Sequence, residues 1–208
     1  SEALTNVMNR KTIWVGVASL LFLAIVALGT VLLTKPANFR GTTFGEPYPI
    51  APEIELTRAD GSRFTLSGMR GRVVLLFFGY TSCPDVCPTT LAELKTALDG
   101  LGEGKADQVN VLFVTVDPER DTPEQVQEYV EHFSSTFIGL SGSLSELEKV
   151  WEEYGVFREI VEGESAAGYI VNHTARVTVI DQQGNMRISF GFDTPVEDII
   201  HDLKLLLK

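Results

Sequence analysis

The sequence contains few cysteines and fewer basic than acidic side chains. Two cysteines among 208 residues exclude a disulfide-rich scaffold and any zinc or iron–sulfur site with four cysteine ligands. Lys and Arg number 17 against 28 Asp and Glu, and the net charge of −11 argues against a nucleic-acid partner, whose phosphates would be repelled. Metal cations and basic protein surfaces remain natural partners. At about 100–200 residues per domain, the length allows one globular domain and an appendage.

One long apolar run lies near the start of the chain. Residues 13–33 carry no charge over 21 positions, and a helix of that length rises about 31 Å, the thickness of the hydrocarbon layer of a bilayer. A cleaved signal peptide would have a shorter apolar region of about 7–15 residues, so we predict a transmembrane anchor helix. Arg10 and Lys11 precede the run, which favours residues 1–12 as a short cytoplasmic N-terminus.

The rest of the chain is then expected outside the cytoplasm. No Arg- and Ser-rich transit peptide precedes the apolar run, which favours a bacterial periplasm, or the outer face of the cytoplasmic membrane, over the mitochondrial inner membrane. Between residues 36 and 52 lie four prolines, two glycines and no hydrophobic periodicity, so residues 34–52 are predicted to form a flexible tether. Residues 53–208 are predicted to form one domain.

The order of elements in this domain indicates the α/β class. Two continuous apolar runs, at 73–79 and 109–116, are expected to be buried strands, and a helical pattern separates them. The alternation predicts a thioredoxin-like fold with a central mixed β-sheet flanked by helices. Further strands are expected at 54–57, 63–66, 156–161, 175–181 and 186–190, and helices at 88–101, after Thr122, at 143–154 and after Thr194.

Both cysteines lie where the first buried strand should end and the first helix begin, in the segment GYTSCPDVCPTT. Sites of α/β proteins favour the carboxyl ends of strands. Pro88 disfavours helical dihedral angles at Cys87, so we expect Cys87 as the helix N-cap and Pro88 as the first helical residue. There the helix dipole would favour a thiolate. Cys83 is expected in the loop that precedes the helix.

Three chemistries are open to a pair of cysteines separated by three residues. A structural disulfide would close a short loop and would constrain the unfolded chain little. A thiol–disulfide oxidoreductase normally has two residues between its cysteines, although the wider spacing still permits a disulfide. Two thiolates with an imidazole suit a soft monovalent ion such as Cu(I). The spacing by itself does not decide among them.

A third metal ligand would be one of the three histidines. His132 and His201 lie among charged neighbours on the polar faces of expected helices, where we expect them to be solvated. His173 comes just before a strongly alternating strand and follows the small, polar residues 162–168, which are typical of a mobile loop. If the sheet places this strand beside the end of the first strand, His173 meets the cysteines; otherwise it is an ordinary loop histidine.

The segments GYTSCPDVCPTT, VDPERDTPE and YIVNHTARVTVID, behind the N-terminal apolar run, resemble the Sco/SenC family of copper chaperones. The resemblance runs in order from about residue 50 to residue 207. It implies a thioredoxin-like fold and a copper ion, as Cu(I) or Cu(II), bound by Cys83, Cys87 and His173. It also implies a role in assembling the binuclear copper centre of cytochrome c oxidase.

Five other residues are expected to support the site. Asp117, Arg120 and Asp121 match a family motif after the second buried strand, and we expect them either to hold their own loop by carboxylate–guanidinium pairing or to orient the cysteine loop or a partner. Asp85 lies between the cysteines and is expected to tune thiol acidity, to contact the recipient or to be a solvated turn residue. Asn172 stands where the family usually has an acidic residue, which is expected to alter the imidazole orientation or the charge of the site.

The resulting hypothesis is a membrane-anchored copper chaperone rather than an enzyme. It would deliver copper to the copper-centre subunit of the oxidase and would receive it from an upstream copper donor. A thiol reductant is a further expected partner, because oxidation of the cysteines to a disulfide would abolish copper binding. A mobile loop at 162–172 would let His173 move away and release the metal. Two alternatives remain open: a thiol–disulfide oxidoreductase that uses Cys83 and Cys87 as its redox pair, and a copper or redox sensor.

Overall fold

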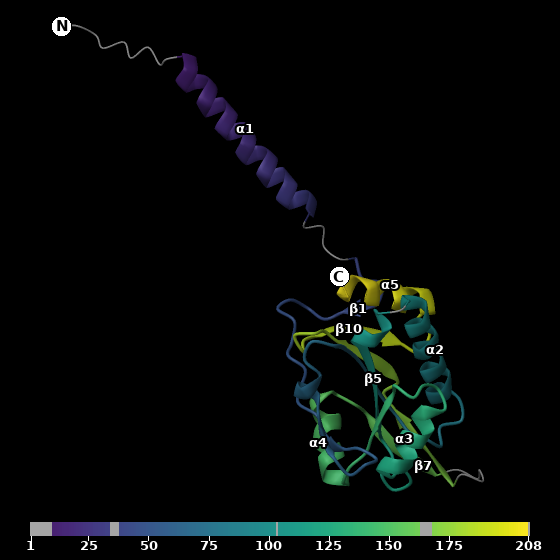
Figure 1. The fold of residues 1–208 in the computed structure, drawn as a ribbon. Coiled ribbons are helices and arrows are strands. Elements are labelled where there is room, and N and C mark those ends of the chain that lie inside the picture. Colours follow the sequence, from purple (N-terminus) through teal and green to yellow (C-terminus); the bar gives the residue numbers. More distant parts are fainter. Residues whose placement is uncertain (1–9, 34–37, 103, 163–167, 208) are drawn as a thin grey trace, which may run out of the picture. The chain divides into compact units, whose positions relative to one another are not determined.

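The computed structural model describes residues 10–33, 38–102, 104–162 and 168–207, in two compact units, Ser1–Asn38 and Phe39–Lys208. The first unit contains helix α1, Arg10–Leu33, over the apolar run, as predicted (Figure 1). Among the described residues, no helix has the length and apolarity needed to cross a membrane, whereas the sequence predicts a transmembrane anchor at residues 13–33. Within the predicted cytoplasmic N-terminus, residues 1–9 lie outside the described part of the chain.

A six-stranded mixed sheet forms the centre of the second unit (Figure 1). The two apolar runs are its neighbouring strands β4 (Val73–Gly79) and β5 (Val109–Thr115), which pair in parallel. All side chains of β4 are buried, as a strand covered on both faces requires. Strand β9 (Arg176–Ile180) pairs antiparallel with β4, so the sheet is mixed, as predicted. The full order is β1 (Thr42–Thr43), β10 (Met186–Gly191), β9, β4, β5 and β6 (Ile138–Leu140).

Helices flank this sheet, which confirms the α/β class. They are α2 (Val86–Leu101), α3 (Pro123–Glu131), α4 (Leu144–Glu153) and α5 (Val196–Leu206), with short 3₁₀ turns η1 (Leu66–Met69) and η2 (Ala106–Gln108). In Figure 1, α4 lies on one side of β5, and α2 and α3 lie on the other. Helices α2 and α5 pack closely at Gly100, where any larger residue would collide with α5: an added Cβ would lie 2.5 Å from Cδ1 of Ile200.

Helices α3 and α4 begin with capping boxes, whereas α2 has no side-chain cap. At α3 the Oγ1 of Thr122 accepts a hydrogen bond from the N–H of Gln125, whose side-chain oxygen accepts in return from the N–H of Thr122. At α2 the N-cap is Asp85 and Cys87 lies inside the first turn, so the prediction of Cys87 as N-cap is wrong. The first turn of a helix has N–H groups without intrahelical acceptors, and Pro88 therefore fits within it.

The described part of the predicted tether, residues 38–52, lies along an edge of the sheet rather than forming a flexible linker. Strand β1 pairs with β10, and the N–H groups of Arg40 and Gly41 donate to the buried carboxylate of Asp202 over 2.8–3.0 Å. Prolines are tolerated there because an edge strand does not need every N–H group. The composition did not indicate this arrangement, since the anchoring carboxylate is in α5, far along the sequence.

Two small hairpins stand apart from the main sheet. One pairs β2 (Glu55–Thr57) with β3 (Arg63–Thr65), and the other pairs β7 (Arg158–Glu162) with β8 (Tyr169–His173). Within the loop predicted at 162–172, residues 163–167 lie outside the described part of the chain, and residues 169–172 belong to β8. For residues 169–172 the prediction of a loop is wrong, because they pair with β7.

Candidate metal centre

The two cysteines follow the carboxyl end of β4. Cys87 is fully buried in the first turn of α2, and Cys83 is partly exposed in the preceding loop. Both are free thiols. The N–H of Cys87 lies 3.5 Å from Sγ of Cys83, so the turn holds the two residues together. Gly79 leaves room for this packing, because a Cβ at that position would lie 2.8 Å from Sγ of Cys87.

The hairpin β7–β8 brings His173 to the same place. Its Nε2 lies 3.8 Å from Sγ of Cys87, and its Nδ1 lies 3.1 Å from the carbonyl oxygen of Thr174. A carbonyl oxygen only accepts hydrogen bonds, so we assign the proton of the neutral imidazole to Nδ1. The lone pair of Nε2 is then directed to the cysteine side, which is the arrangement found in metal-binding histidines whose other nitrogen donates to the backbone.

A cavity of about 230 Å³ opens beside these residues and is lined by Cys83, Asp85, Asn172 and His173, among others. Within the described residues, no three His, Cys, Asp or Glu side chains are grouped closely enough to hold a metal ion. The structure therefore places His173 against Cys87, and Cys87 against Cys83, without closing the predicted set of three ligands.

The two thiols differ in acidity. A hydrogen bond from the Cys87 thiol, assisted by the N–H groups of Asp85 and Cys87, lowers the pKa of Cys83 to about 5. The same hydrogen bond and burial raise the pKa of Cys87 above that of an ordinary thiol. Burial lowers the pKa of His173. At neutral pH the metal-free site therefore holds one thiolate, one thiol and one neutral imidazole.

We expect iodoacetamide to alkylate the reduced protein at Cys83 well before Cys87. The rate should fall only as the pH drops through about 5, because Cys83 is a thiolate above its pKa and is protonated below it. An ordinary thiol would lose reactivity already below about pH 8.5. Peptide mass spectrometry after timed alkylation measures both rates. Faster modification of Cys87, or a pH profile centred near about 8.5, would contradict this assignment.

Residues 116–121, the loop between β5 and α3, contact both sides of the site. Asp121 is buried and accepts hydrogen bonds from the N–H and the hydroxyl of Thr81, two residues before Cys83, at 3.1 and 2.5 Å. Burial raises the pKa of Asp121, and its hydrogen bonds with Thr115 and Thr81 oppose that shift. Asp117 pairs with Arg120 within the loop. Asp117 is also buried, and the phenol of Tyr169 in β8 donates to it at 2.7 Å.

Comparison with known proteins assigns this arrangement to a family. The family model described as SCO1/SenC matches residues 43–208. The chain belongs to the SCO1/SenC family. The SCO2-like protein of Rickettsia prowazekii is 31% identical over 202 residues, a match that covers 97% of this chain and 96% of that protein.

Solved structures of SCO1/SenC proteins have the same fold. The copper-bound ScoI of Bradyrhizobium japonicum is 38% identical, with a TM-score of 0.68, over 76% of this chain and 99% of that one. The apo Sco1 protein of Thermus thermophilus is 37% identical, with a TM-score of 0.73, over 82% of this chain and 98% of that one. The Sco resemblance of the sequence is thus confirmed at the level of family and fold.

The other predicted residues of this SCO1/SenC site lie at its rim. Asp85 and Asn172 are exposed and line the cavity. Asp85 lowers the pKa of Cys83 through its backbone N–H.

The other two histidines lie outside the site. His132 is exposed, as expected. His201 is partly exposed and its Nδ1 lies 2.8 Å from a carboxylate oxygen of the buried Asp202, so its side chain is only partly solvated.

Two tyrosines of the site were not expected from the sequence. Tyr80 is buried, and its ring lies edge-on to the ring of His173 with the centroids 5.9 Å apart. Tyr169 precedes His173 by four positions on β8, so the two side chains are on the same face of the strand. That spacing was the available signal, but it requires β8 to be recognised as a strand.

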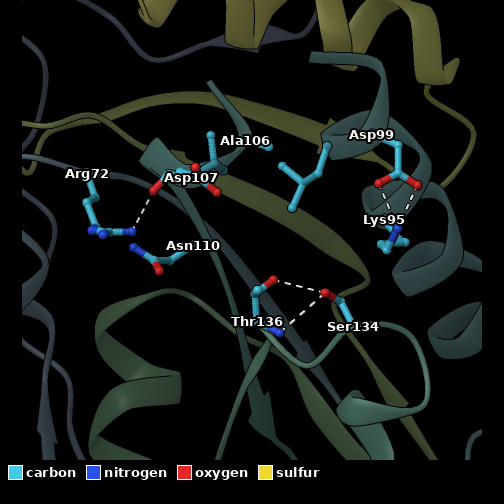
Figure 2. A pocket seen from close by; sticks show the side chains of 10 residues that line it. Arg72, Lys95, Asp99, Ala106, Asp107, Asn110, Ser134 and Thr136 are labelled. Atoms are coloured by element: carbon cyan, nitrogen blue, oxygen red, sulfur yellow. Dashed lines mark hydrogen bonds and ion pairs between the residues drawn. The ribbon is translucent and has the colours of Figure 1, made fainter. Parts of the chain in front are cut away.

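A second cavity, of about 550 Å³, lies at the opposite end of the central strands (Figure 2). Arg72 and Asn110, at the starts of β4 and β5, line it, and several of its other polar groups make hydrogen bonds or ion pairs. The guanidinium of Arg72 donates to the carbonyl of Asp107, Lys95 pairs with Asp99, and Ser134 hydrogen-bonds with Thr136. Neither the cysteines nor His173 line this second cavity.

Proposed function

We propose that this protein binds copper through Cys83, Cys87 and His173 and delivers it to the copper-centre subunit of cytochrome c oxidase. The observation that carries the proposal is the 3.8 Å separation of Nε2 of His173 from Sγ of Cys87, with Nδ1 held by the backbone. Ligands bonded to one metal ion at about 2.0–2.3 Å stand about 3.5–4 Å apart. The copper-bound ScoI of Bradyrhizobium japonicum, a 38% identical relative, supports the choice of metal.

The donor set fits copper cargo. Two cysteine sulfurs and a neutral imidazole are soft to intermediate ligands, which favour copper over the oxygen-binding cations. Cys83 supplies a thiolate at neutral pH, whereas Cys87 loses its proton on binding the metal. The partly exposed Cys83 lies at the cavity mouth, where an incoming thiolate or imidazole of the recipient can replace the ligands one at a time.

Attachment to a membrane belongs to the same proposal. A solved relative from Bacillus anthracis is described as a SCO1/SenC family lipoprotein. We infer that this chain works at a membrane surface, outside the cytoplasm, beside the oxidase. The sequence is the basis for proposing residues 13–33 as the anchor and for proposing a thioredoxin-like domain. It is also the basis for proposing an upstream copper donor and a thiol reductant.

The low pKa of Cys83 favours a second candidate, a thiol–disulfide oxidoreductase. The Cys83 thiolate would attack a disulfide of the oxidase subunit and form a mixed disulfide, releasing one thiolate of the target. Cys87, after losing its proton, would then attack Cys83 and release the second thiolate of the target, which leaves the Cys83–Cys87 disulfide. This reaction uses both cysteines but not His173.

Copper transfer separates the two candidates. The Cu(I)-loaded protein is mixed with the metal-free copper-binding domain of an oxidase subunit in its reduced form, and the copper content of each is measured after separation. We expect copper to move from the wild-type protein, and His173→Ala to bind and deliver far less. In a separate assay the same oxidase domain carries its cysteines as a disulfide. Reduction of this disulfide by His173→Ala at the wild-type rate would show that the protein is also a thiol–disulfide oxidoreductase. Full copper binding and transfer by His173→Ala would contradict the proposed ligand set.

A further inference from the structure

The strand that carries His173 is not part of the main sheet. Strand β8 pairs only with β7 among the described strands, so the position of the imidazole depends on how this hairpin is attached to the body of the domain. Tyr169, Val171 and His173 share one face of β8 and are more buried than the two residues between them. Val171 is buried in the core, with Tyr169 at one end of the strand and His173 at the other.

Tyr169 makes three contacts with the loop at residues 116–121. Its hydroxyl donates to a carboxylate oxygen of Asp117 at 2.7 Å, and its carbonyl oxygen accepts from the Arg120 guanidinium at 3.1 Å. The guanidinium carbon of Arg120 lies 3.7 Å from the centroid of the Tyr169 ring, a stacked cation–π contact. Asp117 is fully buried and pairs with Arg120 as well, so one carboxylate joins the phenol and the guanidinium.

The same loop also reaches the cysteines. Asp121 holds Thr81, at the start of the cysteine loop, and the guanidinium carbon of Arg120 lies 5.7 Å from the ring centroid of Tyr80. The ring of Tyr80 in turn contacts His173. The loop is therefore a common base for the cysteine side and the histidine side of the site.

We propose that Tyr169 is a positioning residue that sets the distance between His173 and Cys87 by fixing β8 to the Asp117–Arg120 pair. This inference rests on the proposed function, because the distance matters for metal binding. Without the phenol–carboxylate hydrogen bond, Arg120 still contacts the carbonyl oxygen and the ring of residue 169, but β8 loses its direct link to the buried carboxylate of Asp117. The strand can then shift against the loop, and Nε2 of His173 is no longer restricted to one position relative to Sγ of Cys87. Supporting residues of metal ligands typically contribute about tenfold to a hundredfold to metal affinity.

The test compares Tyr169→Phe with Tyr48→Phe in the full chain. The phenol of Tyr48 also donates to a carboxylate, that of Glu46 at 2.8 Å, but on an exposed segment outside the site, so it is a matched control. In the metal-free protein, we expect the imidazole resonances of His173 in a ¹H–¹⁵N NMR spectrum to shift or broaden in Tyr169→Phe and to stay unchanged in Tyr48→Phe. The dissociation constant for Cu(II) should rise about tenfold in Tyr169→Phe alone.

Asp117→Asn provides a second variant, which keeps the shape of the side chain and weakens the same hydrogen bond, and it should change the His173 resonances in the same direction. His173 resonances and copper affinity in Tyr169→Phe equal to those of Tyr48→Phe would overturn the inference. If the wild-type protein binds no copper, the proposed function fails, but the metal-free NMR comparison still decides whether Tyr169 positions His173.

Discussion

Replacing Cys87 with serine is expected to weaken Cu(I) binding by more than about a hundredfold, beyond the usual cost of losing a supporting residue. A serine hydroxyl is a hard ligand that stays protonated at neutral pH and does not replace a thiolate for a soft ion. Water also has little access to the side chain of residue 87, because Cys87 is fully buried and packs against β4, where a Cβ at Gly79 would lie 2.8 Å from its sulfur. Competition with a chromophoric Cu(I) chelator measures the loss.

The neighbouring serine provides the matched control. Ser82→Ala changes an exposed side chain next to Cys83 and is expected to leave Cu(I) affinity within about twofold of the wild type, because it removes no ligand. Circular dichroism and thermal unfolding should show that Cys87→Ser stays folded, since the substitution is nearly isosteric. Binding by Cys87→Ser within tenfold of the wild type would show that the copper site lies elsewhere.

Replacing Asp121 with alanine is expected to lower the free energy of unfolding by about 3 kcal/mol, because it leaves several buried donors without an acceptor. The carboxylate accepts from the N–H of Thr81 and from the hydroxyls of Thr81 and Thr115, and it is almost fully buried. Each unsatisfied buried donor costs about 1–3 kcal/mol, and the hydroxyls recover part of this by rotating to other acceptors. Urea unfolding monitored by tryptophan fluorescence provides the measurement.

Asp107→Ala is the control for this prediction, because Asp107 has the same side chain in an exposed position. We expect it to change the free energy of unfolding by less than about 0.5 kcal/mol. The Asp121 variant should also loosen the cysteine loop and raise the alkylation rate of Cys87. Equal stabilities of the two variants would mean that Asp121 does not hold the loop at residues 116–121 to Thr81.

The sequence predicts the central elements well where hydrophobic pattern and local chemistry agree. The continuous apolar runs at 73–79 and 109–116 form the two parallel strands, since short, uninterrupted apolar runs are typical of strands covered on both faces. The capping box at Thr122 depends on residues three apart and therefore could be identified locally. The placement of both cysteines at the carboxyl end of β4 follows from the same strand.

What the sequence did not predict depends on contacts between distant segments. Residues 38–52 have the composition of a linker, but they are held by β10 and by Asp202 of α5. Strand β8 reads as the end of a polar loop until its partner β7 is known. The roles of Tyr80 and Tyr169 arise only when the hairpin lies against the loop at residues 116–121. Tertiary partners decided these cases, and local propensity contains no information about them.

The most direct test of the central claim is copper K-edge X-ray absorption spectroscopy of the Cu(I)-loaded protein and its His173→Ala variant. The proposed site predicts two sulfur ligands and one nitrogen ligand in the wild type, with the nitrogen contribution lost and both sulfurs retained in the variant. Identical spectra for the two proteins, or a wild-type spectrum without two sulfur ligands, would contradict copper binding by Cys83, Cys87 and His173.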